Sequence, residues 1–200
     1  MAPRIERALI EHAVAAGGTP SSDYDLNADL RSQSRGELRD AGVLVAFIDR
    51  PSGAHIILTK RASHLKHHPG QVAFPGGRMD PCDRDVVDAA LREANEEIGL
   101  PPASVDVIGQ LPHHETVSSY AMTPVLGWVT RDFAPQPEAG EVAEYFEVPA
   151  DFVLNPSNFR IEKRRWRGAD RAYFTVPFGP YYIWGATARV LRGLAERVAQ

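Results

Sequence analysis

The chain has 200 residues, of which 44% are hydrophobic, and this is enough for one domain with a buried core. Its 26 acidic and 22 basic residues give a formal net charge of −4, which argues against broad nucleic-acid binding because no surplus of cations neutralises phosphates. A single cysteine, Cys82, excludes an intramolecular disulfide and no apolar run spans a membrane, so we expect a cytoplasmic protein without a membrane partner.

The N-terminal part predicts one helix followed by a polar link. Residues 3–16 have helical periodicity, and residues 17–40 are rich in glycine, serine and charged side chains. We therefore separate an N-terminal helix and link, residues 1–37, from a main domain, residues 38–195. The expected apolar face of the helix consists of Ile5, Ala8, Leu9, Ala13 and Ala16.

The main domain predicts strands and helices in an order that is typical of a mixed sheet between helices, that is, an α/β fold. Two helices are expected, at about 84–98 and at 184–198. The second is apolar at Val190, Leu191, Leu194 and Val198. Strands are expected at 42–49, 55–60, 71–74, 104–111, 122–130, 143–148, 159–165 and 172–177.

Three glutamates define the most informative helix. Glu93, Glu96 and Glu97 stand at i, i+3 and i+4, so their carboxylates share one face and repel one another. A divalent cation removes that repulsion, and Mg²⁺ or Mn²⁺ prefers carboxylate oxygens and substrate phosphates as ligands. The alternative is a solvated acidic face, which such spacing more often forms when it occurs alone.

The ends of this helix support a preorganised site. Gly76 and Gly77 allow the backbone to turn sharply and to approach a ligand closely. Asp83 is expected to cap the start of the helix, and Gly99 to end it in a left-handed conformation.

A basic segment, residues 60–68, precedes the glycines. It contains Lys60, Arg61, Lys66 and the histidines His64, His67 and His68. A basic cluster beside carboxylates and a metal suits a multiply charged phosphate ligand. The alternative is a solvated basic loop.

Residues 77–100 resemble the Nudix box, the signature of hydrolases of nucleoside diphosphates linked to another group. Its second half, Arg-Glu-aliphatic-x-Glu-Glu-x-Gly-aliphatic, matches at Arg92, Glu93, Glu96, Glu97, Gly99 and Leu100. Ala94 replaces the larger aliphatic residue, and the middle of the box is one residue longer than the usual pattern. Asp83 therefore corresponds only loosely to the usual first glutamate, and we give it no metal role.

Residues 57–77 resemble the segment that precedes this box in coenzyme A pyrophosphatases. The spacing of Thr59, Arg61, Gly70 and Phe74-Pro75-Gly76-Gly77 fits that segment throughout. Lys66 replaces an arginine, and lysine does not bind phosphate in a bidentate manner. Weaker similarity continues at residues 122–127, 141–149 and 183–188.

The resemblance implies the Nudix α/β/α sandwich and metal-dependent hydrolysis of the coenzyme A diphosphate to 4′-phosphopantetheine and adenosine 3′,5′-bisphosphate. It also implies a possible homodimer. Arg92 would orient the glutamates, and Glu141 and Glu144 are candidates for a carboxylate outside the box. The expected metal site is formed by Glu93, Glu96, Glu97 and Gly77. The expected substrate-binding residues are Arg61, Lys66, His68, Gly70, Phe74, Gly76 and Gly77.

Two alternatives to this function stay open. One is a Nudix hydrolase of another nucleotide, such as ADP-ribose, NADH or a nucleoside triphosphate. The other is a nucleotide sensor without catalysis, although three crowded carboxylates serve little purpose in such a protein.

Overall fold

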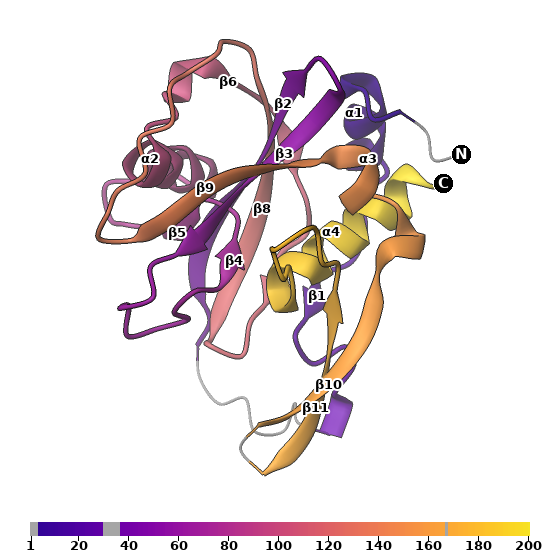
Figure 1. Ribbon diagram of the computed structural model, residues 1–200. Helices are drawn as coiled ribbons and strands as arrows, with labels where there is room; N and C mark the ends of the chain where they lie inside the picture. The colour runs from indigo at the N-terminus through magenta and orange to yellow at the C-terminus, as the bar shows by residue number, and fades with distance from the viewer. Residues whose placement is uncertain (1–3, 30–36, 167) are drawn as a thin grey trace.

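The computed structural model describes residues 4–29, 37–166 and 168–200 (Figure 1). The strands of its main sheet are β1 (Ser21–Ser22), β2 (Arg39–Arg50), β3 (Gly53–Arg61), β4 (Val72–Ala73), β5 (Gly76–Arg78), β6 (Val105–Gln110), β7 (His114–Glu115), β8 (Tyr120–Val129) and β9 (Val142–Pro149). The helices are α1 (Arg7–Ala15), α2 (Val86–Ile98), α3 (Ala150–Val153) and α4 (Gly185–Val198). A separate hairpin consists of β10 (Arg160–Trp166) and β11 (Ala169–Thr175).

The main sheet is mixed, as the sequence predicts. At its centre β2 runs parallel to β8 and antiparallel to β3, and β9 pairs antiparallel with the other edge of β3. The short strand β5 pairs antiparallel with the first part of β2. This pairing brings Gly76 and Gly77, which we call the glycine loop, to the middle of the sheet, where α2 crosses it (Figure 1).

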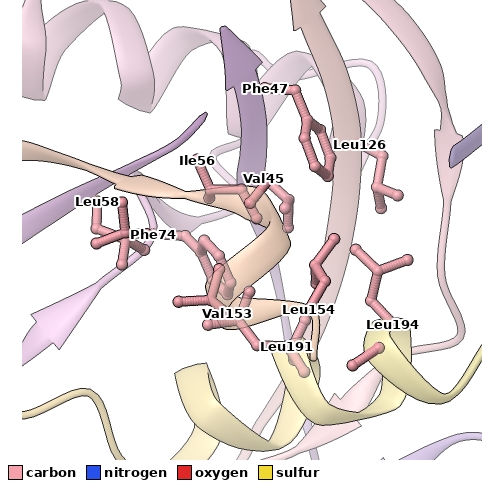
Figure 2. Close-up of a cluster of buried hydrophobic side chains, with 14 of the residues drawn as sticks. Val45, Phe47, Ile56, Leu58, Phe74, Leu126, Val153, Leu154, Leu191 and Leu194 are labelled. Atoms are coloured by element: carbon pink, nitrogen blue, oxygen red, sulfur yellow. The ribbon is translucent and has the colours of Figure 1, made fainter. Parts of the chain in front are cut away.

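Alternating side chains of β2 divide the hydrophobic core between two layers of helices. One face packs against α2, and its cluster includes Leu44, Ala46, Ile48, Ala90 and Ile98. The other face packs against α1, α3 and α4, and Figure 2 shows part of this larger cluster, including Val45, Phe47, Leu126, Leu191 and Leu194. The α/β/α sandwich is therefore confirmed.

The N-terminal helix exists, but its buried face differs from the predicted one. α1 covers Arg7–Ala15, and residue 3, where the helix was expected to begin, lies outside the described residues. Ala8 and Ala16 are exposed, whereas Ile10 is fully buried. A register centred on Ile10 and Ala13 buries more apolar surface than the predicted one, because isoleucine is larger than alanine.

The other predicted strands and helices are confirmed within a few residues of their expected ends. The short strands β1, β5 and β7 and the helix α3 were not predicted. Within the predicted link 17–40, β1 pairs with β7, and residues 30–36 lie outside the described part of the chain. No helix in the described ranges is both long enough and apolar enough to cross a membrane.

A buried polar network attaches the N-terminal segment to the domain. His114 is fully buried, with Nδ1 2.9 Å from the Ser21 hydroxyl and Nε2 3.4 Å from a carboxylate oxygen of Asp23. The other Asp23 oxygen accepts a hydrogen bond from the Val117 N–H and pairs with Arg171 at 3.1 Å. Burial alone would raise the pKa of Asp23, but these partners together hold it below its ordinary value.

We predict that Asp23→Asn lowers the free energy of unfolding by about 2 kcal/mol at pH 7, because buried hydrogen bonds to a charged group are lost. A depressed carboxyl pKa contributes stability above the unfolded value of about 4, and that contribution disappears as the pH falls through the folded pKa. The difference between wild type and variant, measured by urea unfolding, should therefore shrink toward pH 3. A difference that stays constant with pH would contradict the network, and Asp25→Asn, which removes an exposed pairing with Arg189, is the matched control.

Candidate active site

Helix α2 carries the glutamates, and both of its ends are fixed by local interactions. The Asp85 carboxylate accepts hydrogen bonds from the backbone N–H groups of Val87 and Asp88 at 2.9 and 3.0 Å. Gly99 ends the helix with φ of +70°, as predicted. The capping role expected for Asp83 is therefore wrong, because the helix starts two residues later than that assignment requires.

Asp83 instead anchors Arg92. Its two carboxylate oxygens accept hydrogen bonds from Nε and Nη2 of Arg92, both at 2.9 Å. The remaining nitrogen of the guanidinium, Nη1, lies 3.0 Å from Glu93 and 3.0 Å from Glu96. Arg92 thus bridges two of the three glutamates and is itself held by a buried partner. The long middle of the motif places Asp83 where it reaches this arginine.

Glu97 is the buried member of the acidic face, with only 5% of its surface exposed. Burial raises its pKa to about 8, although the Gly76 N–H, which donates to Oε2 at 3.3 Å, acts in the opposite direction. Among nearby charges, Glu93 and Glu141 raise the pKa further, and Arg61 lowers it. Such a carboxylate is costly to keep ionised unless a cation binds it.

Glu93 lies against the glycine loop. A Cβ atom built on Gly77 would lie 2.5 Å from the carboxyl carbon of Glu93, so only glycine leaves room for this side chain. Burial raises the pKa of Glu93, and the negative charges of Glu96 and Glu141 add to this effect, whereas Arg92 opposes it. Glu96, by contrast, has 58% of its side-chain surface exposed. The three carboxylates therefore range from buried to solvated.

The segment before β9 brings a fourth carboxylate to this place. The backbone N–H groups of Gln136 and Glu138 donate to the carbonyls of Ile98 and Glu97, both at 2.9 Å, and so cover the last turn of α2. The chain then reaches Glu141, whose charge acts on both Glu93 and Glu97. This wrapping path positions Glu141 beside the acidic face.

Glu144 has a different neighbour. Its carboxylate accepts a short hydrogen bond from the Tyr181 hydroxyl, and the Tyr181 ring stacks on Phe146 with centroids 3.6 Å apart. Phe146 belongs to the core on the α4 side of the sheet. Of the two carboxylates expected outside the box, the structure thus brings Glu141 and not Glu144 to the acidic face.

The residues expected to bind substrate fall into two groups. Arg61 ends β3 close enough to Glu97 to act on its charge, and Lys66 and His68 are exposed on the loop that follows. That loop turns through positive φ at His68 (+53°) and Gly70 (+68°). Phe74, in contrast, is buried among the side chains of the larger core and is not available to a substrate in this conformation (Figure 2).

The acidic face fits a divalent metal ion in its chemistry. Its donors are hard carboxylate oxygens, and the charged forms of two of them, Glu93 and Glu97, are disfavoured by burial and by neighbouring carboxylates. In the conformation seen, no group of three or more histidine, cysteine, aspartate or glutamate side chains within the described ranges is arranged to hold an ion. Arg92 contacts one carboxylate oxygen of Glu93 and one of Glu96, so the second oxygen of each group can still serve as a ligand while Arg92 orients it.

A wide surface pocket lies elsewhere. It has a volume of about 840 Å³ and lies where β2 turns into β3, lined by residues such as Arg50, Gly53 and Trp128. This is the opposite end of β2 from the residues that pair with Gly76 and Gly77. None of the glutamates of α2 lines it, so its size alone does not mark it as the active site.

Comparison with known proteins shows to which family the chain belongs. The model of the NUDIX domain matches residues 38–167. The chain belongs to the Nudix family. A protein of Enterobacter sp. (strain 638) named "Uncharacterized Nudix hydrolase NudL" is 40% identical over 160 residues, which cover 80% of this chain and 83% of the relative. A Cronobacter sakazakii protein of the same name is 38% identical over 179 residues, covering 90% and 93%.

Solved Nudix structures have the same fold. The Nudix hydrolase RenU of M. smegmatis matches with a TM-score of 0.50 and 24% identity over 58% of this chain and 74% of that one. A MutT/nudix family protein of Enterococcus faecalis matches with a TM-score of 0.51 and 11% identity, covering 98% and 76%. These similarities concern the fold alone. Together with the family and the curated relatives, they make the chain a Nudix hydrolase, a class that uses divalent metal ions and acts on small nucleotide derivatives.

We predict that Gly77→Ala lowers the rate of diphosphate hydrolysis by about 100-fold while leaving the melting temperature nearly unchanged. The added methyl group collides with the movable end of Glu93, so the carboxylate is displaced and the backbone is not. Gly193→Ala is the control, because its Cβ would meet Arg189 at an ordinary 3.5 Å. It should keep the activity, with a melting temperature equal to or above that of wild type, since alanine favours a helix. A Gly77→Ala enzyme with wild-type turnover would show that Glu93 has no fixed role.

Proposed function

We propose that this Nudix hydrolase cleaves the diphosphate of coenzyme A or its derivatives with Mg²⁺ or Mn²⁺. The products would be 4′-phosphopantetheine, or its acyl form, and adenosine 3′,5′-bisphosphate. The observation that carries the proposal is the position of Arg61. This residue belongs to the segment that resembles coenzyme A pyrophosphatases, and its charge acts directly on Glu97 of the acidic face.

The charges around the site suit a diphosphate that binds between the basic segment and the acidic face. The carboxylates of Glu93, Glu96 and Glu97 would hold the metal ion, which neutralises the diphosphate and polarises a water molecule. Arg61, whose charge acts on Glu97, and the exposed Lys66 of the following loop would supply positive charge to the diphosphate. An anionic substrate therefore meets cations from the protein and cations bound by the glutamates.

The remaining residues of the site orient these groups or accept a proton. Arg92 fixes Glu93 and Glu96 through its own attachment to Asp83. Glu141 lies near Glu93 and Glu97 without belonging to α2, so it is the candidate that would accept a proton from the attacking water. The backbone at Gly76 and Gly77 lets phosphate approach the helix closely.

The first experiment compares substrates directly. Purified protein is incubated with coenzyme A, ADP-ribose or NADH in Mg²⁺, Mn²⁺ or chelator, and the products are identified by mass spectrometry. Metal-dependent release of 4′-phosphopantetheine, with coenzyme A preferred, is the expected result. Preference for ADP-ribose or NADH would overturn the substrate assignment and keep the Nudix chemistry, and absence of turnover with all three would favour the nucleotide sensor.

We predict that Glu97→Gln reduces turnover by more than about 100-fold, since even groups that only support metal ligands cost 10- to 100-fold when removed. The amide occupies the same buried space, so circular dichroism and the melting curve should remain those of a folded protein. Asp88→Asn is the matched control, because this carboxylate lies on the same helix and pairs with Arg84, away from the acidic face. Unchanged activity of Glu97→Gln would refute the metal assignment.

A further inference from the structure

One face of the β10–β11 hairpin carries aromatic and arginine side chains and contacts the segment that precedes α4. Figure 1 shows the backbone of the hairpin and of α4. We call this the hairpin surface, and it consists of Arg164, Arg171, Tyr173, Tyr182 and Trp184. Tyr182 is 42% exposed, which makes it one of few large hydrophobic side chains at the described surface. The rings of Tyr173 and Trp184 meet edge to face with centroids 5.2 Å apart, and the hydroxyls of Tyr173 and Tyr182 are 3.1 Å apart.

The two arginines of this surface are not equally compensated. Arg164 and Arg171 lie directly opposite each other in the register of the hairpin, an arrangement that destabilises a strand pair when both charges have the same sign. Arg171 is compensated by Asp23 at 3.1 Å. Arg164 instead lies over the ring of Trp184, 5.1 Å from its centroid, and forms no ion pair with a carboxylate among the described residues. An anion bound here would relieve the repulsion.

Glu162 limits where an anion could bind on this face. It shares the face with Arg164, and its carboxylate accepts a hydrogen bond from the Tyr182 hydroxyl at 2.6 Å. Its negative charge repels an anion from the open end of the hairpin, where β10 begins and β11 ends. A phosphate is therefore directed to the guanidinium of Arg164.

The hairpin surface adjoins the basic segment. The Thr187 hydroxyl donates to the carbonyl of Val72 in β4 at 3.1 Å, and a Cβ on Gly185 would lie 3.7 Å from Nε2 of Gln71. Trp184 immediately precedes Gly185, and Gln71 closes the loop that contains the basic segment. Trp184 and the basic segment are thus linked through the start of α4 and β4, which lie side by side in Figure 1.

We propose that the hairpin surface binds the adenosine 3′-phosphate end of the substrate, with Tyr182 stacking on the base and Arg164 pairing with the phosphate. The inference rests on the proposed function, since coenzyme A carries this phosphate and ADP-ribose and NADH do not. A guanidinium pairs with phosphate through two parallel hydrogen bonds, and an exposed aromatic ring can stack on a nucleotide base such as adenine. Trp184 acts as a positioning residue that holds Arg164 in place.

The kinetic test compares coenzyme A with dephospho-coenzyme A, which lacks only the 3′-phosphate. Arg164→Gln should lower kcat/KM for coenzyme A about tenfold, the size expected for one charge-assisted pairing, and should hardly change it for dephospho-coenzyme A. The loss should appear in KM, because the metal site is untouched. Arg165→Gln is the matched control, since this exposed arginine is the next residue and points to the opposite face of the same strand. Equal losses for both substrates, or the same loss in Arg165→Gln, would overturn the proposal.

A binding test separates this inference from the proposed function. Isothermal calorimetry with adenosine 3′,5′-bisphosphate and with 5′-AMP needs no turnover. Wild type should bind the bisphosphate more tightly, Arg164→Gln should remove that preference, and Tyr182→Ala should weaken both nucleotides alike. These results in a protein that fails to hydrolyse coenzyme A would support the surface and reject the proposed function. A wild type that does not distinguish the two nucleotides would overturn the surface, whatever its activity.

Discussion

The close packing of α2 on the sheet is the constraint on which the active site depends. A Cβ on Gly42 would lie 2.1 Å from the carbonyl oxygen of Val86, and a Cβ on Gly77 would collide with Glu93. The absence of these two side chains lets the helix approach the strands. That approach buries Glu97 beneath the glycine loop and within reach of the Gly76 N–H. The close approach of α2 to the strands thus sets the geometry of the site. The same approach buries the carboxylate of Glu97 and so raises its pKa.

Bringing the helix so close has an electrostatic cost that the structure compensates in steps. Burial disfavours the charged forms of Glu93 and Glu97. Nearby carboxylates raise both pKa values further, Glu96 and Glu141 that of Glu93, and Glu93 and Glu141 that of Glu97. Arg92 offsets part of this cost for Glu93 and Glu96, and Arg61 for Glu97. Neither arginine is placed to neutralise all the carboxylates together. A divalent cation does so from a single position, which is why the same cluster that weakens an isolated helix serves a metal-dependent hydrolase.

The sequence predicted the long strands and helices of this molecule. It did not predict the short elements, which depend on individual contacts. β2 and β3 contain continuous apolar runs, and the apolar stripe of α4 is long enough to define a helical period. β1, β5 and β7 have two or three residues each, and such lengths contain no period at all. The helix start was placed at Asp83 rather than Asp85, because both are aspartates and only their distances to Val87 and Arg92 distinguish them.

The same limit applies to the active site. The glutamates of α2 share a face by helical geometry alone, so the sequence was sufficient to group them. Glu141 and Glu144 were equivalent candidates in the sequence. Their positions near the start of one predicted strand do not show which face of the sheet each carboxylate lies on. The hydrogen bonds from Gln136 and Glu138 to the end of α2 carry Glu141 to the acidic face, and the pairing of β9 with β3 leaves Glu144 with Tyr181.

The acidic face lies within the part of the chain that matches the family model, whereas the residues of the hairpin surface other than Arg164 lie beyond it. The glycine loop, α2 and Glu141 all lie within residues 38–167, the part that matches the family model. Tyr182 and Trp184 lie beyond it, and Arg171 is held by Asp23 from the segment that precedes it. The pairing of Asp23 with Arg171 therefore joins sequences on both sides of the matched part, and the contact of Asp23 with His114 attaches them to it. A hydrolytic centre shared by a family of nucleotide hydrolases gains selectivity most readily from such additions, because they alter contacts to the distant end of the substrate without disturbing the carboxylates.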